Sequence, residues 1–109
     1  MSELLGTFEQ SVLLSILGLR ADAYGRAILN RAQEQLGRKV AAGAVYATLE
    51  RLEAQGLVSS RLTDGTPVRG GRARRYYSVA AEGQRALSDT RRALTSMWKD
   101  AQLPVEEGR

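Results

Sequence analysis

Apolar residues recur at helical spacing in the first third of the chain. Between residues 8 and 17 they fall at the intervals of an amphipathic helix, which we expect to end near Gly18. A second stripe of apolar residues runs from residue 24 to residue 36. Asp22 is the expected N-cap of this second helix, and Gly37 is its expected C-cap. The pattern therefore predicts two short helices joined by a brief loop.

A third apolar stripe follows after another short connection. Val45, Leu49 and Leu52 stand at i, i+4 and i+7, and the helix that they define is expected to end near Gly56. Short consecutive helices with Gly-containing turns are what a helix-turn-helix requires. Many small helical bundles share the same pattern, so the three helices alone do not decide between the two.

The periodicity changes after the third helix. In residues 57–62, Val58, Ser60 and Leu62 alternate with Leu57, Ser59 and Arg61, which suits a half-buried strand. A turn-forming cluster occupies residues 64–67, and β-forming residues interleaved with arginines follow at 74–79. These features predict a β-hairpin whose tip spans residues 64–73.

A long helix is predicted at the end of the chain, from residue 81 to about residue 102. Leu87, Leu94 and Trp98 fall on one face, and Pro104 ends the pattern. At 1.5 Å per residue the helix is about 33 Å long, comparable to the diameter of the preceding domain. We therefore expect a partner helix to cover part of its apolar face. The alternative is that the helix folds back wholly onto the first helix.

Length and composition limit the function classes that remain. The chain has 109 residues, 43% of them hydrophobic, which fits one globular domain. No apolar run reaches the length of a membrane span, and no export signal is recognised, so we expect a cytoplasmic protein with no membrane partner. The sequence has no Cys and no His, which removes the commonest metal ligands and general base. We expect neither an enzyme nor a cofactor.

Positive charge is concentrated in the predicted hairpin. Residues 61–77 include five arginines and a single acid, Asp64, so this stretch accounts for the whole net charge of +4. Double-stranded DNA is a partner that explains such a cluster, because arginines near phosphates release condensed counterions. The alternative is a solubilising loop, since Arg-rich loops are common on soluble proteins.

Particular segments narrow the fold to a winged helix of one family. Residues 43–58 (GAVYATLERLEAQGLV) resemble the recognition-helix signature of PadR-like transcriptional regulators. Residues 71–77 (GRARRYY) are similar to the wing of that family, residues 82–83 (EG) to the start of its last helix, and residues 23–25 (AYG) to the start of its second helix. The resemblance covers nearly the whole chain and is to the short members with one C-terminal helix.

The resemblance implies a mainly α fold with a small β-hairpin. Residues 1–80 would form a winged helix-turn-helix DNA-binding domain, residues 81–103 a dimerisation helix, and residues 104–109 a tail. The implied function is a sequence-specific DNA-binding regulator, a repressor that binds a pseudopalindromic operator as a homodimer and is released by a small apolar or aromatic effector. The alternative function is a winged-helix adaptor that binds protein and not DNA.

The start of the recognition helix departs from the family pattern. Ala41 and Ala42 stand where the family commonly has Ser-Pro, and the missing hydroxyl cap should cost the helix about 1 kcal/mol. The small residues here permit close approach to DNA but offer few side-chain hydrogen bonds. We therefore expect phosphate positioning to outweigh base reading.

The candidate DNA-contacting residues lie on the recognition helix and the wing. They are Lys39, Ala42, Gly43, Tyr46, Thr48, Arg51, Arg69, Arg72, Arg74 and Arg75. Tyr46 could pack against the hairpin or give its hydroxyl to a phosphate, and the resemblance favours the phosphate. Arg75, near the base of the hairpin, could instead pair with Glu50 or Glu53.

The candidate dimer and effector residues lie on the last helix. They are Leu87, Leu94, Met97 and Trp98. The simplest role of Trp98 is a side chain in a dimer core. The resemblance adds a second role, because an aromatic residue near this place in short PadR-like proteins lines a pocket for flat, apolar effectors.

Overall fold

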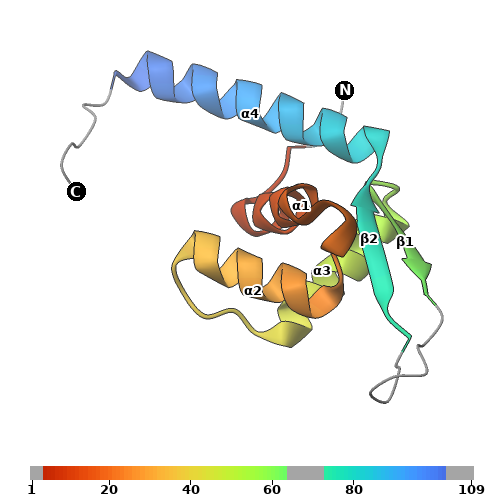
Figure 1. Cartoon of the computed structure of the whole chain (residues 1–109). Coiled ribbons are helices and arrows are strands. Elements are labelled where there is room, and N and C mark those ends of the chain that lie inside the picture. The colour runs from red at the N-terminus through yellow and green to blue at the C-terminus, as the bar shows by residue number, and fades with distance from the viewer. Residues whose placement is uncertain (1–3, 64–72, 103–109) are drawn as a thin grey trace.

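The computed structural model describes residues 4–63 and 73–102, and these form a three-helix body, a hairpin and a long final helix (Figure 1). In chain order the elements are α1 (Thr7–Leu19), the 3-10 turn η1 (Arg20–Asp22), α2 (Gly25–Leu36), α3 (Ala42–Ala54), β1 (Val58–Leu62), β2 (Arg75–Val79) and α4 (Ala81–Ala101). Every element predicted from the sequence is present, with its ends within a few residues of the expected ones.

The core lies where the apolar faces of α1, α2 and α3 meet. The central side chains are fully buried, among them Leu13 of α1, Ile28 of α2 and Leu49 of α3. Val58 at the start of β1 and Ala86 of α4 close this core from the other side. The stripes seen in the sequence are therefore the faces that these helices bury against one another.

The hairpin gains a third strand-like segment from the loop before α2. β1 and β2 pair antiparallel, with Val58 opposite Val79. Tyr24 forms a bridge with Tyr76, and the backbone N–H of Tyr77 donates to the carbonyl of Ala23 at 2.8 Å. This pairing holds residues 23 and 24 in an extended conformation.

The start of α2 differs from the sequence prediction for that reason. Asp22 was expected as the N-cap, but it lies in the η1 turn, and the N-cap is Tyr24, with φ −104° and ψ 165°. A residue paired to the sheet cannot also be helical, so the helix starts only at Gly25. At the other end Gly37 is the C-cap, as predicted, with the left-handed φ of 71° that favours glycine.

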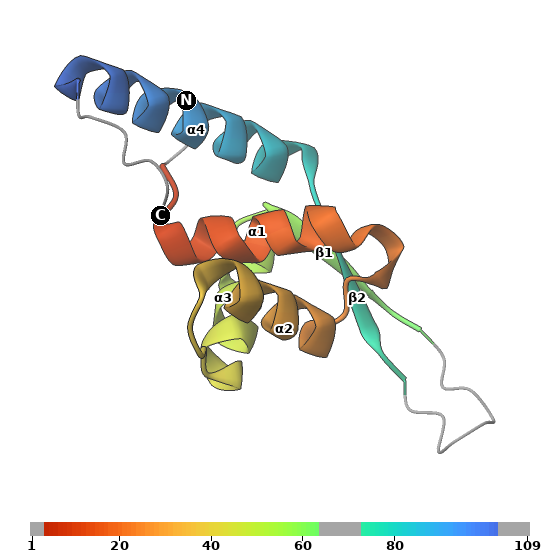
Figure 2. The same ribbon diagram turned by 60° about the vertical axis from the view of Figure 1, so that its left-hand side comes forward.

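α4 packs on the body through its first half only. Gly83, Ala86 and Thr90 are its buried residues. The hydroxyl of Thr90 accepts a buried hydrogen bond of 3.0 Å from the backbone N–H of Leu5, which ties the segment before α1 to α4. The second half of α4 extends past α1 in both views (Figures 1 and 2). The alternative in which this helix folds back wholly onto α1 is therefore wrong.

Two parts of the candidate interface lie on the same side of the molecule. The start of α3, the end of β1 and the start of β2 all lie on the side of the molecule opposite α4 (Figures 1 and 2). None of the helices in the described ranges combines the length and apolar character needed to cross a membrane. Among the same residues, no group of three or more acidic side chains is placed to hold a metal ion.

Candidate nucleic-acid interface

The start of α3 is an open surface made of very small residues. Ala42 and Gly43 are exposed, and no atom lies within 4 Å of the position that a Cβ on Gly43 would take. The N-cap is Ala41, which makes no side-chain cap hydrogen bond, as expected from the missing hydroxyl. Lys39 is exposed in the connection just before the helix. The backbone at the start of α3 is therefore accessible to a large ligand such as a DNA duplex.

Tyr46 extends this surface toward the start of α2. Its side chain is 46% exposed, and its ring lies against Gly25. A Cβ atom on Gly25 would be 2.6 Å from the hydroxyl oxygen of Tyr46, so a larger residue there would require the exposed ring to move. The two helices are joined at this point by an aromatic side chain whose hydroxyl is near the first residue of α2.

Thr48 is not available to a DNA ligand. It was expected as a polar contact, but it is only 4% exposed and packs on the buried face of α3. Position 48 lies three residues after Val45 and four before Leu52, so it shares their face of the helix. The prediction of a polar contact at Thr48 is therefore wrong, and the spacing of residue 48 from Val45 and Leu52 already indicated that it would be buried.

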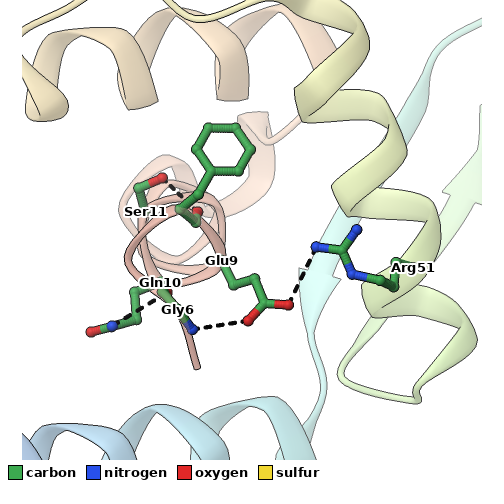
Figure 3. Close-up of polar contacts among 6 residues, drawn as sticks. Gly6, Glu9, Gln10, Ser11 and Arg51 are labelled. Carbon is green, nitrogen blue, oxygen red and sulfur yellow. Dashed lines mark hydrogen bonds and ion pairs between the residues drawn. The ribbon is translucent and has the colours of Figure 1, made fainter. Parts of the chain in front are cut away.

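Arg51 is engaged in an ion pair between α3 and α1. Its Nη2 lies 3.3 Å from Oε2 of Glu9, and the other oxygen of that carboxylate accepts the backbone N–H of Gly6 at 3.0 Å (Figure 3). The pair is partly exposed, so its contribution to stability is about 0.2 to 1 kcal/mol. Its main consequence is that the charge of Arg51 is already compensated in the free protein.

Arg74 lies on the face of the hairpin that meets Tyr24. Its guanidinium carbon is 4.1 Å from the centroid of the Tyr24 ring. Tyr76 lies on the same face, with its ring centroid 5.8 Å from that of Tyr24 in an edge-to-face arrangement, and Arg61 stands over Tyr76 at 5.3 Å. In the described part of the chain no carboxylate pairs with Arg74 or Arg61.

Arg75 points to the opposite face of the hairpin, because successive side chains of a strand alternate. Its Nη1 donates to the Ser60 hydroxyl at 3.0 Å, and that hydroxyl donates to a carboxylate oxygen of Glu53 at 2.7 Å. The expected alternative pairing of Arg75 with an α3 carboxylate is thus present through a bridging serine. Tyr77 is half-buried on this face, and burial raises the pKa of its phenol above 10.0, an effect that Arg75 partly opposes.

The expected contacts thus separate into distinct groups. Lys39, Ala42, Gly43, Tyr46 and Arg74 are accessible to a ligand. Arg51 and Arg75 already have polar partners in the protein. Arg69 and Arg72 lie outside the described residues. The stack of Tyr24 under Arg74 could not be predicted, because residues 24 and 74 are far apart in the sequence and only the bridge to β2 brings them together.

Three of the four residues expected at a dimer or effector site, Leu87, Leu94 and Trp98, lie along a groove between α1 and α4, whereas Met97 does not line it. The groove has a volume of about 600 Å³, and its apolar lining includes Leu14, Leu17, Leu87, Leu94 and Trp98. Leu87 also packs against the core. Leu94 is 37% exposed, Met97 56% and Trp98 62%, so the apolar end of α4 is uncovered in the single chain.

Three helices followed by an antiparallel hairpin and a long final helix form a winged helix. The family model described as the transcriptional regulator PadR-like family matches residues 13–89, well over half of the chain. The chain belongs to the PadR-like family of transcriptional regulators. The matched residues include the whole recognition helix, both strands of the wing and most of the packed half of α4.

Known relatives agree with this assignment. The PadR-like chain is 42% identical over 66 residues to the transcriptional regulator Rv3488 of Mycobacterium tuberculosis, a match that covers 59% of this chain and 56% of that protein. It therefore spans little more than half of this relative. The chain is also similar in structure to a PadR family transcriptional regulator from Eggerthella lenta, with 30% identity, a TM-score of 0.65 and coverage of 83% of this chain and 76% of that one.

The fold is also that of a PadR-like transcription factor from Bacteroides fragilis. The TM-score is 0.71 at 23% identity, and the match covers 88% of this chain and 87% of that one. At this identity the similarity supports the fold alone. The match covers most of both chains, so the similarity is one of the overall fold.

Proposed function

We propose that this PadR-like regulator binds double-stranded DNA as a homodimer, reads a pseudopalindromic operator and represses transcription. The main support for the proposal is that the exposed start of α3 lies on the same side of the molecule as the end of β1 and the start of β2 (Figures 1 and 2). A helix-turn-helix protein places the start of its recognition helix in the major groove. A wing on the same side then lies along the adjacent backbone.

The accessible residues take different roles in this proposal. Ala42 and Gly43 allow the backbone of α3 to approach the base edges, Tyr46 gives its hydroxyl to a phosphate, and Lys39 adds charge beside the groove. Arg74 contacts the phosphates flanking the groove. Arg51 has a smaller role than the sequence suggested, because Glu9 already neutralises its charge.

Selection of bound duplexes from random DNA tests this proposal directly. We expect the selected sequences to share an inverted repeat, with half-site centres about one helical turn, or 34 Å, apart. Recovery of no common sequence, together with a salt-independent interaction with a protein, would favour the adaptor function instead.

The salt dependence of DNA binding should distinguish Arg74, which is accessible, from Arg51, which is paired with Glu9. Each neutralised phosphate contributes about −0.9 to the slope of log affinity against log salt. We expect Arg74→Ala to flatten the slope by about one unit, and Arg51→Ala to change it little. Fluorescence anisotropy of a labelled duplex at several salt concentrations measures both. Equal changes in the two variants would contradict this assignment.

We further propose that the groove beside α4 takes a flat, apolar effector. Its apolar lining and its volume of about 600 Å³ fall in the range of small-molecule sites, and Trp98 is exposed at its edge. Since Trp98 is the only tryptophan, a planar aromatic compound that binds there should change the protein's tryptophan emission. An unchanged emission across a panel of planar aromatic compounds, with DNA affinity equally unaffected, would contradict the effector proposal.

A further inference from the structure

A stack of two tyrosines and two arginines connects α2 to the wing. Arg74 lies over Tyr24 at 4.1 Å, Tyr24 meets Tyr76 edge to face at 5.8 Å, and Arg61 stands over Tyr76 at 5.3 Å. Tyr24 is the N-cap of α2, Arg61 lies in β1, Tyr76 lies in β2, and Arg74 directly precedes β2. Nothing in the recognition helix takes part in these contacts.

The backbone holds both partners of the closest contact in place. Tyr24 is bridged to Tyr76, and its carbonyl accepts the N–H of Ile28 in the first turn of α2. The carbonyl of Arg74 accepts the N–H of Thr63 at 2.8 Å and the Thr63 hydroxyl at 3.0 Å. The backbones of Tyr24 and Arg74 are thus held in place by hydrogen bonds that do not involve either side chain.

The stacked geometry leaves the hydrogen-bonding groups of Arg74 available. The guanidinium carbon lies over the Tyr24 ring, and among the described residues no oxygen accepts a hydrogen bond from the Arg74 side chain. The contact with the ring therefore restricts the group without occupying it with an oxygen acceptor. The neighbouring Arg75 is different, because one of its N–H groups is already given to Ser60, which is held in turn by Glu53.

We propose that Tyr24 is a positioning residue for DNA binding, whose ring holds the guanidinium of Arg74 in the orientation in which its free N–H edge meets a backbone phosphate. This inference rests on the proposed function. An arginine that is already ordered loses less conformational freedom when it binds. Tyr24 thus acts on DNA through Arg74, and the aromatic ring is the part that matters.

The test is a double-mutant cycle in duplex DNA binding. We expect Tyr24→Phe to bind a labelled mixed-sequence duplex like the wild type, and Tyr24→Leu to bind about three- to tenfold more weakly. In the Arg74→Ala background Tyr24→Leu should have no further effect. The matched control is the Arg75→Ala background, in which the loss caused by Tyr24→Leu should remain, since Arg75 points to the other face of the hairpin.

Several outcomes would overturn the role of Tyr24 while leaving DNA binding intact. One is an equal loss in Tyr24→Phe and Tyr24→Leu, and another is a loss that persists without Arg74. Failure of the wild type to bind any duplex would instead overturn the proposed function, and the role of Tyr24 with it.

A second measurement does not depend on how well Tyr24→Leu folds. In the free wild-type protein, the side-chain Nε–H signal of Arg74 should carry an upfield ring-current shift that the Arg75 signal lacks. Absence of that shift would mean that the ring does not hold the guanidinium, and would overturn the proposal.

Discussion

Alanine in place of Gly83 is expected to destabilise the fold by about 2 to 4 kcal/mol, a large part of the roughly 5 to 15 kcal/mol that stabilises a typical domain. A Cβ at this position would lie 2.2 Å from the carbonyl oxygen of Leu57 and 2.8 Å from a methyl carbon of Val79. The carbonyl cannot move away freely, because it accepts the N–H of Ala80 at 2.9 Å. Urea denaturation followed by circular dichroism measures the loss.

The same substitution at Gly43 is the matched control. Gly43 also lies in a helix, but a Cβ there would meet no atom within 4 Å. Gly43→Ala should therefore leave stability unchanged or raise it by up to about 1 kcal/mol, through better helix propensity. Similar losses at both positions would mean that the contact with Leu57 is not the cause of the loss at position 83, because helix propensity favours alanine at both.

Aspartate in place of Leu94 is expected to separate the proposed dimer into monomers. Leu94 stands with Met97 and Trp98 on the uncovered apolar end of α4. Replacement removes an apolar side chain and places a charge in the interface, where an unpaired carboxylate is costly to bury, so the association constant should fall at least about 100-fold. Sedimentation velocity should find the wild type near twice 11.9 kDa and the variant near 11.9 kDa.

Ser96→Asp is the control for the charge itself. At about 100° per residue, position 96 lies some 200° around the helix from position 94, on the polar side of α4. The same new carboxylate should therefore leave the dimer intact. Dissociation of both variants to the same extent, or a wild type that is monomeric at micromolar concentration, would contradict the proposed interface. Circular dichroism of Leu94→Asp should retain the helical signal, since the side chain is already partly exposed.

The helices and strands could be predicted from the periodicity of the sequence. The prediction was wrong where contacts between distant segments determine the end of an element. The helical stripes and the alternation in the hairpin depend on neighbouring residues, so they can be read from the sequence. The start of α2 cannot, because Tyr24 is held extended by Tyr76, some fifty positions away. Asp22 had the better capping chemistry and still lies outside the helix.

The accessible surface was harder to predict than the fold. Burial of Thr48 could have been read from its spacing to Val45 and Leu52, whereas the ion pair of Arg51 with Glu9 depends on how α1 crosses α3. An argument from charge alone does not distinguish Arg74 from Arg75. Their partners, a tyrosine ring for one and a serine and a glutamate for the other, exist only in the assembled structure.

The pairing of Leu62 with Arg75 determines which of the two neighbouring arginines lies on the face of Tyr24 and which on the face of Ser60. A shift of β2 by one residue relative to β1 would exchange their faces while the net charge stayed at +4. The face on which each arginine of the strand lies, and hence its partner, therefore depends on whether its position is odd or even. Two sequences with the same number of arginines here can present different charge beside Tyr24.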